Sequence, residues 1–136
     1  MSHTLQFGDL QKGQAFARFP LSISADEVDA YLASTGEAAE AWREHVPPIF
    51  VDAIAIAALL QTVAIPKGVM HTGQEHESHR AVRIGEALEM EMRVSALSER
   101  RGAVMAAFEA DLTDADGGSV ATMKISVMVL PDGVSA

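Results

Sequence analysis

The feature that most constrains this chain is an apolar stretch that opens with a double proline and closes at a Pro-Lys-Gly break. Residues 46–68 read VPPIFVDAIAIAALLQTVAIPKG. Prolines suit the first turn of a helix, and the residues that follow predict a helix from Ile49 to Val63. Because this helix has almost no polar face, other structure has to cover it. In a small domain the simplest cover is one curved sheet wrapped around the helix.

The segments that flank this helix predict a strand and a helix before it and a run of strands after it. Residues 16–23 alternate roughly, as a strand does. Ser24 and Glu27 form a capping box that starts a helix, and Gly36 is placed to end it. After the apolar helix, alternation predicts strands over residues 69–82, 87–97, 103–113 and 119–130. This order is that of an α+β domain with an antiparallel sheet around one central helix.

Composition sets several classes of protein aside. With 136 residues, 49% hydrophobic and 21% charged, and no repeat or long linker, residues 1–136 are expected to form a single domain. The formal net charge of -9 opposes binding to nucleic acid or to an anionic membrane. The absence of cysteine excludes disulfides, thiolate nucleophiles and cysteine-ligated zinc. No signal peptide is recognisable, and the apolar stretch is short for a membrane span of about 20 residues, so we expect a cytoplasmic protein.

Three histidines follow the apolar helix, in the segment VMHTGQEHESHRAVRIG. In an unbroken strand, His71 and His79 lie on the same face as Glu75 and Glu77, and His76 lies on the other face. This spacing is no established zinc pattern, so neither a metal nor another cofactor is expected.

Together these segments resemble the MaoC-like dehydratase family, and more narrowly the branch named after the dehydratase domain of fungal fatty-acid synthase. The resemblance rests on the proline start of the central helix, the His71-Thr72-Gly73 segment, the turn from His79 to Glu86 and the turn from Asp114 to Gly117. It covers nearly the whole chain. It implies the hotdog fold, an antiparallel sheet wrapped around a long buried central helix.

The resemblance also implies an activity on acyl thioesters. Members hydrate enoyl thioesters of coenzyme A or acyl carrier protein, or run the reverse dehydration, with an Asp and a His in a pattern like D-x-N-P-x-H. This chain departs from that pattern, because Glu37-Ala38-Ala39-Glu40 follows Thr35-Gly36. The family's catalytic pair is therefore not carried over. Some subunits of this branch lack the pair, bind the acyl chain and work beside a catalytic subunit, so that function stays open.

The candidate catalytic residues are Asp52 and His71, with His45 and Glu37 as weaker claimants. Asp52 is interpreted either as an acid that stabilises the positive end of the helix or as a buried carboxylate that acts as general acid or base. Hotdog thioesterases use a carboxylate on or near this helix, so a thioesterase that relies on Asp52 is a third possible function.

The expected thioester groove lies between Pro47 and Gly73. Backbone N–H groups at the helix start are expected to bind the thioester oxygen. Arg80 and Arg83 are interpreted in one of two ways. They bind the phosphates of coenzyme A or an acidic carrier protein, or they form a solvated pair that offsets nearby glutamates. The expected substrate-binding residues are Pro48, Ile49, Phe50, Val51, Gly73, Arg80 and Arg83. An open sheet edge favours a homodimer, or a heterodimer with another hotdog subunit.

Overall fold

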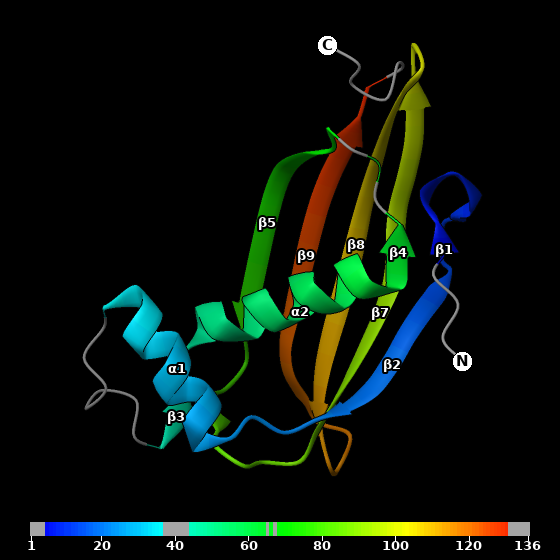
Figure 1. Cartoon of the computed structure of the whole chain (residues 1–136). Coiled ribbons are helices and arrows are strands. Elements are labelled where there is room, and N and C mark those ends of the chain that lie inside the picture. Colours follow the sequence, from blue (N-terminus) through cyan, green and yellow to red (C-terminus); the bar gives the residue numbers. More distant parts are fainter. Residues whose placement is uncertain (1–4, 37–43, 65, 67, 131–136) are drawn as a thin grey trace.

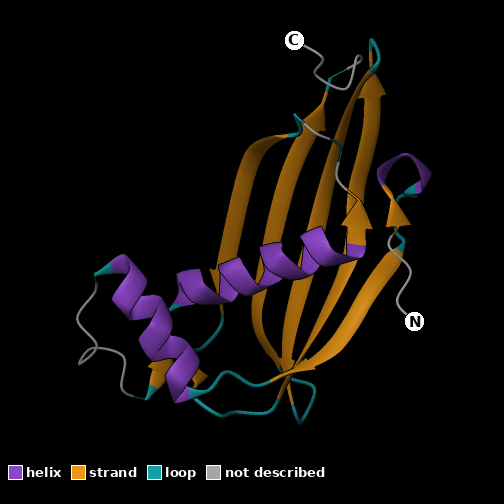
Figure 2. Ribbon diagram, in the orientation of Figure 1, coloured by secondary structure: helices purple, strands orange, loops and turns teal. Residues whose placement is uncertain are grey.

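The computed structural model describes residues 5–36, 44–64, 66 and 68–130. A five-stranded antiparallel sheet, in the order β2-β7-β8-β9-β5, forms one layer, and a long helix crosses one face of it (Figures 1 and 2). A second helix lies at one end of that helix. The elements are β1 (Leu5–Gln6), a 3₁₀ turn (Phe7–Asp9), β2 (Ala15–Leu21), α1 (Ala25–Thr35), β3 (His45–Val46), α2 (Pro48–Thr62), β4 (Val63–Ala64), β5 (Met70–Ser78), β6 (Val82–Arg83), β7 (Leu88–Arg100), β8 (Ala103–Asp114) and β9 (Ser119–Val129).

Helix α2 is the apolar helix expected from the sequence, and it begins one residue earlier. Val51, Ala55 and Leu59 follow one another at four-residue spacing, and each is at most 2% exposed. Their side is the one that the sheet covers. On the other side Ile49 is 65% exposed and Leu60 is 59% exposed, so the described part of one chain covers α2 from one side. No helix among the described residues is long and apolar enough to cross a membrane.

The long central strands alternate as predicted and form the core. On β7 the side chains of Leu88, Met90, Met92 and Val94 are buried, and the residues between them are half-buried. Strands β8 and β9 repeat the pattern, so their inward rows meet α2 while their polar rows face outward. The two-residue period, broken at Ala106–Phe108 where three successive residues are buried, therefore places this sheet with one face on the core.

Helix α1 is built from the predicted signals and is attached to the start of α2. The Ser24 hydroxyl accepts a hydrogen bond from the Glu27 N–H, and the Glu27 carboxylate accepts one from the Ser24 N–H. Gly36 ends the helix with a φ of 76°, a conformation that favours glycine. Tyr31 stacks on Phe50 of α2 with ring centroids 4.7 Å apart. This contact joins α1 to the end of α2 that carries the candidate site.

The strand expected over residues 69–82 is broken in two. β5 ends at Ser78, and β6 pairs with β3 in a separate two-stranded ladder. The turn between them carries His79 and Arg80, whose backbone N–H groups both donate to the Val120 carbonyl, at 2.9 and 3.4 Å. These bonds fold the chain away from the large sheet, so residues 78–82 form a wall at its end.

An irregularity inside β5 changes which face His71 occupies. The register shifts between His71 and Gly73, so His71 lies opposite the buried Val127, on the inner face. Glu75 lies opposite Lys124 on the outer face. The prediction that His71 shares a face with Glu75 and Glu77 is wrong, because one extra residue in a strand exchanges the faces of everything before it.

Candidate functional site

The candidate site begins with a contact between Asp52 and His76. His76 Nδ1 lies 2.7 Å from Asp52 Oδ1, and the two side chains are 18% and 14% exposed. Asp52 lies past the first turn of α2. His76 lies opposite the buried Met123 in the ladder, and therefore on the face of β5 that looks toward the helix. The pair joins the central helix to the edge strand. Because the two residues are 24 positions apart in the sequence, only folding brings them together.

The contact orients the imidazole ring. An ionised carboxylate only accepts hydrogen bonds, so the Nδ1–H group of His76 donates to Asp52. In the neutral imidazole the other ring nitrogen, Nε2, then carries the lone pair. A carboxylate that holds a histidine in this way sets the direction of the ring and its tautomer, which is the arrangement that a general base requires.

A cavity of about 200 Å³ lies beside His76. Apolar side chains of α2, β3, β6 and β9 supply much of its lining, and the end of β5 and the turn after it supply the polar groups. The lining residues are Val46, Pro48, Val51, His76, Ser78, His79, Arg80, Ala81, Val82 and Ala121. A small apolar hollow with a few convergent polar groups is the form that a small-molecule site takes.

The start of α2 borders the same cavity. Its N-cap residue, Pro47, has no side chain that can cap the helix, and Pro48 has no N–H. The Phe50 N–H donates to the Pro47 carbonyl at 3.0 Å. Ile49 has no intrahelical acceptor, because the carbonyl four residues earlier lies before the helix. The positive end of the helix dipole therefore lies at Pro48, which lines the cavity.

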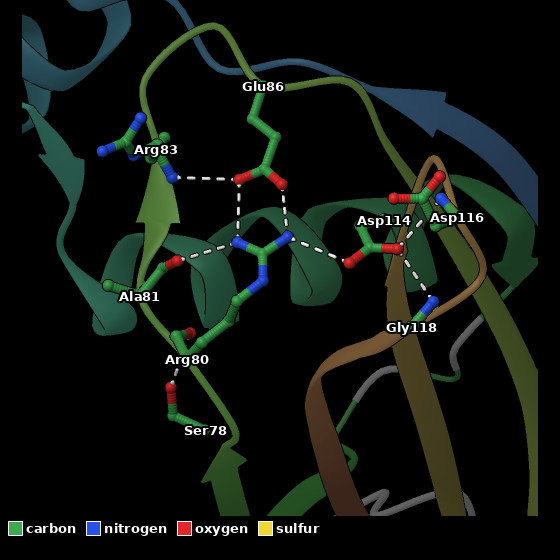
Figure 3. A network of polar contacts seen from close by, with 8 residues as sticks. All are labelled: Ser78, Arg80, Ala81, Arg83, Glu86, Asp114, Asp116 and Gly118. Atoms are coloured by element: carbon green, nitrogen blue, oxygen red, sulfur yellow. Dashed lines mark hydrogen bonds and ion pairs between the residues drawn. The ribbon is translucent and has the colours of Figure 1, made fainter.

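Arg80 is held by carboxylates from two other turns (Figure 3). Its guanidinium donates to both oxygens of Glu86, to Asp114 Oδ2 at 3.3 Å and to the Ala81 carbonyl at 3.0 Å. Hydrogen bonds from Arg80 are the main reason that the pKa of the Glu86 carboxyl lies below its usual value. The pKa of Asp114 is also lowered, first by the Gly118 N–H and then by Arg80. Residues Arg80, Glu86 and Asp114 are called the arginine clamp below.

The arginine clamp predicts a specific response to acid. A carboxyl whose pKa is lowered by folding adds stability that is complete above its unfolded pKa and is lost as the pH falls through the lower, folded value. Glu86→Gln should therefore unfold at lower urea concentration than the unchanged protein at neutral pH. This difference should stay constant down to about pH 5 and narrow below the ordinary value of 4.5. Urea titrations from about pH 7 to pH 3 measure it, with the exposed Glu77→Gln as control. A difference that keeps its full size at about pH 3 would contradict the clamp's role.

The structure brings some of the predicted site residues together and leaves others apart. Asp52, Pro48 and Val51 lie at the cavity or in contact with a residue that lines it. His71 lies at the other end of β5, about 16 Å from His76 by the rise of a strand. Gly73 lies near His71, and a side-chain carbon at Gly73 would meet the Ser126 side chain at 3.8 Å, an ordinary contact. The structure therefore does not bring His71 to Asp52.

Of the remaining candidates, Arg80 lines the cavity, and others lie away from it or outside the described residues. Arg83 lies on β6, opposite His45 of β3 in the short ladder, and its side chain is exposed. Glu37 lies outside the described residues. His76 is the residue that sequence reasoning missed as a partner of Asp52. Alternation predicted that His76 lies on the other face of the strand from Glu75 and Glu77. A histidine that faces inward, next to an apolar helix with one acidic residue, was the signal that could have identified the pair.

Comparisons with known proteins agree with this fold. A family described as FAS1-like, dehydratase domain region, matches residues 10–123. A search of curated proteins finds no significant match.

Solved structures of hydratases and dehydratases are similar to the chain. The C-terminally truncated (3R)-hydroxyacyl-ACP dehydratase complex HadBC from Mycobacterium tuberculosis contains a chain 19% identical, with a TM-score of 0.71, over 86% of this chain and 96% of that one. The (R)-hydratase of A. caviae involved in PHA biosynthesis is 23% identical, with a TM-score of 0.66, over 88% and 96%. A MaoC-like dehydratase from Rhodospirillum rubrum is 17% identical, with a TM-score of 0.72, over 91% and 95%. At these identities the likeness shows the fold, and the hotdog architecture expected from the sequence is confirmed.

Proposed function

Because the chain belongs to the FAS1-like dehydratase domain family of MaoC-like hotdog proteins, we propose that it hydrates an enoyl thioester, or runs the reverse dehydration, with His76 and Asp52 as its acid–base pair. The observation that carries the proposal is the 2.7 Å contact between these residues beside a small apolar cavity. The thioester is one of coenzyme A or of acyl carrier protein.

Each group of the site has a place in this reaction. His76 Nε2 accepts a proton from water as the water oxygen bonds to the β-carbon of the enoyl group. The electron pair of the double bond moves toward the thioester carbonyl, whose oxygen becomes negative. The Ile49 N–H and the positive end of α2 stabilise that oxygen. The protonated pair then delivers the proton to the α-carbon, which yields the hydroxyacyl thioester and restores His76.

A second function has its own support. The family's D-x-N-P-x-H pattern is missing from this chain. Two of the similar structures are those of complexes, HadBC and ChsH1-ChsH2, both from Mycobacterium tuberculosis. We propose as the alternative that this chain binds the acyl group and works beside a catalytic hotdog subunit. A thioesterase that relies on Asp52 is the third possible function, and the thioester assay described below distinguishes it from the other two.

The chain also carries a surface suited to pairing with another hotdog subunit, either a second copy or a different chain. β5 is an edge strand of the sheet, and its backbone groups are open to a further strand (Figure 1). The exposed Ile49 and Leu60 of α2 lie outside the cover of the sheet and add apolar area.

The test of function is a panel of saturated and enoyl thioesters, run on a preparation whose mass has been measured by light scattering. We expect loss of enoyl absorbance without release of free thiol, from an assembly of at least two chains of 14.4 kDa. Thiol release would assign a thioesterase. Turnover that requires a second, catalytic hotdog subunit would assign the binding subunit. Failure of every thioester to react or to bind would overturn all three.

A further inference from the structure

We propose that the cavity beside His76 accepts only a short acyl chain and that Arg80 sets this limit by holding one wall of the cavity in place. The inference rests on the proposed function, which makes the cavity an acyl-thioester site. It adds the class of substrate, crotonyl-like rather than decenoyl-like, and a residue that determines specificity.

The size of the cavity is the first observation. Its volume of about 200 Å³ is smaller than the roughly 300–1,000 Å³ of sites that bury drug-sized ligands. Four buried side chains close its apolar side: Val46, Val51, Val82 and Ala121, each at most 5% exposed. These side chains belong to the packed core of the domain, which has little free volume to give up. A long acyl chain therefore cannot extend in their direction without displacing core residues.

The wall formed by residues 78–82 is the second observation, because it is fixed at several points. The backbone N–H groups of His79 and Arg80 donate to the Val120 carbonyl of β9, and the Ser78 hydroxyl donates to the Arg80 carbonyl at 3.2 Å. The Arg80 side chain extends from this wall to Glu86 and Asp114, as Figure 3 shows. One arginine thus ties the cavity wall to the turn before β7 and to the turn between β8 and β9.

The charge around Arg80 favours a structural role over phosphate binding. One guanidinium contacts two carboxylates, Glu86 and Asp114, so the arginine clamp carries a net negative charge. A phosphate at the same place would meet two acids as well as one base. The fork of an arginine suits a fixed, planar bridge between carboxylates. We therefore assign to Arg80 the role of holding the wall formed by residues 78–82 in place.

The test compares kcat/KM for crotonyl-CoA and trans-2-decenoyl-CoA. We expect the unchanged protein to prefer crotonyl-CoA by about tenfold or more, since a misfitting hydrocarbon pocket discriminates on this scale. Arg80→Gln should reduce the preference to about threefold or less, chiefly by lowering KM for the long substrate. Arg80→Lys should lie between the two, because a lysine can pair with one carboxylate but cannot bridge both. The pH profile of kcat should keep its shape, since the acid–base pair is untouched.

Arg18→Gln is the matched control, because Arg18 also pairs with a glutamate, Glu89 at 2.7 Å, but outside this cavity. It should keep the full preference. Val82→Ala enlarges the cavity without touching the arginine clamp, and it should also relax the preference. If Arg80→Gln does not fold, Val82→Ala and Arg80→Lys test the inference.

Binding of saturated thioesters separates this inference from the proposed function. Calorimetry with butyryl-CoA and decanoyl-CoA needs no turnover, and the unchanged protein should bind butyryl-CoA about tenfold more tightly or better. This order without any turnover would support the short-chain limit while overturning the catalytic proposal. Turnover with equal preference for long and short chains would overturn the short-chain limit alone. An unchanged preference in Arg80→Gln and Val82→Ala would overturn the role of the wall.

Discussion

His76→Gln is expected to lower kcat/KM for hydration of an enoyl thioester by about 10²–10⁴-fold, the usual share of a general acid–base group. Glutamine keeps a polar side chain of similar reach but has no nitrogen that can accept and return a proton. Because His76 is half-buried and Asp52 is its side-chain partner among the described residues, the substitution removes a hydrogen bond without opening the core. The fold should therefore survive, and circular dichroism with a thermal scan checks that it does.

Asp52→Asn extends the same prediction to the partner of His76. An asparagine has nearly the shape of the aspartate, but it can turn its amide N–H₂ group toward Nδ1 and so favour the other tautomer of the histidine. We expect a loss comparable to that of His76→Gln. The double variant should lose hardly more than either single one, because two residues that act as a unit are not additive.

Two controls match these changes. Glu77→Gln alters the neighbour of His76 on the exposed face of β5, and Asp29→Asn alters an exposed acid of α1. Both should keep the rate of the unchanged protein. Rates in His76→Gln or Asp52→Asn within about threefold of that protein, far less than an acid–base group supplies, would show that the contact is structural. The binding-subunit alternative would then stand as the better account.

Much of this fold can be predicted from the sequence, because local signals and burial agree over long segments. The two-residue period of β7, β8 and β9 runs without interruption through most of each strand. The capping box at Ser24 and the glycine stop at Gly36 mark both ends of α1. The prolines mark the start of α2 within one residue. In each case one residue type has one physical reason to be there.

The site was harder to predict, because its geometry depends on an irregularity and on contacts between distant residues. The register shift between His71 and Gly73 has no clear signature in the amino-acid sequence, yet it changes the face of the strand on which His71 lies. Arg80 was considered for its charge alone, whereas its partners Glu86 and Asp114 come from turns that approach it only in the folded chain. Asp52 was named, but its partner is decided by where α2 crosses β5. The sequence pattern predicts well which face of a strand or helix a residue occupies, but it predicts poorly where one element crosses another.

Phe108→Ala is expected to cause the largest loss of stability among the substitutions considered, about 3–5 kcal/mol. Phe108 is fully buried on β8, the middle strand of the five, and its ring meets Phe16 of β2 edge to face with centroids 5.7 Å apart. Removing the ring leaves a cavity between α2 and the sheet that close-packed neighbours cannot fill. A small domain has a total stability of about 5–15 kcal/mol, so the loss is a large share of it.

Urea denaturation measures this loss, with the half-buried Phe19→Ala of the edge strand β2 as control. The control should cost clearly less, because its ring lies partly in water and its removal opens no closed cavity. If Phe108→Ala is too unstable to purify, Phe108→Leu keeps most of the volume and should cost about 1.5 kcal/mol or less. A loss for Phe108→Ala no larger than that for Phe19→Ala would mean that the core does not close around Phe108. Phe108 belongs to the core of the same sheet that carries Ala121 and His76. A well-packed ring at Phe108 therefore also helps to keep the size of the cavity fixed.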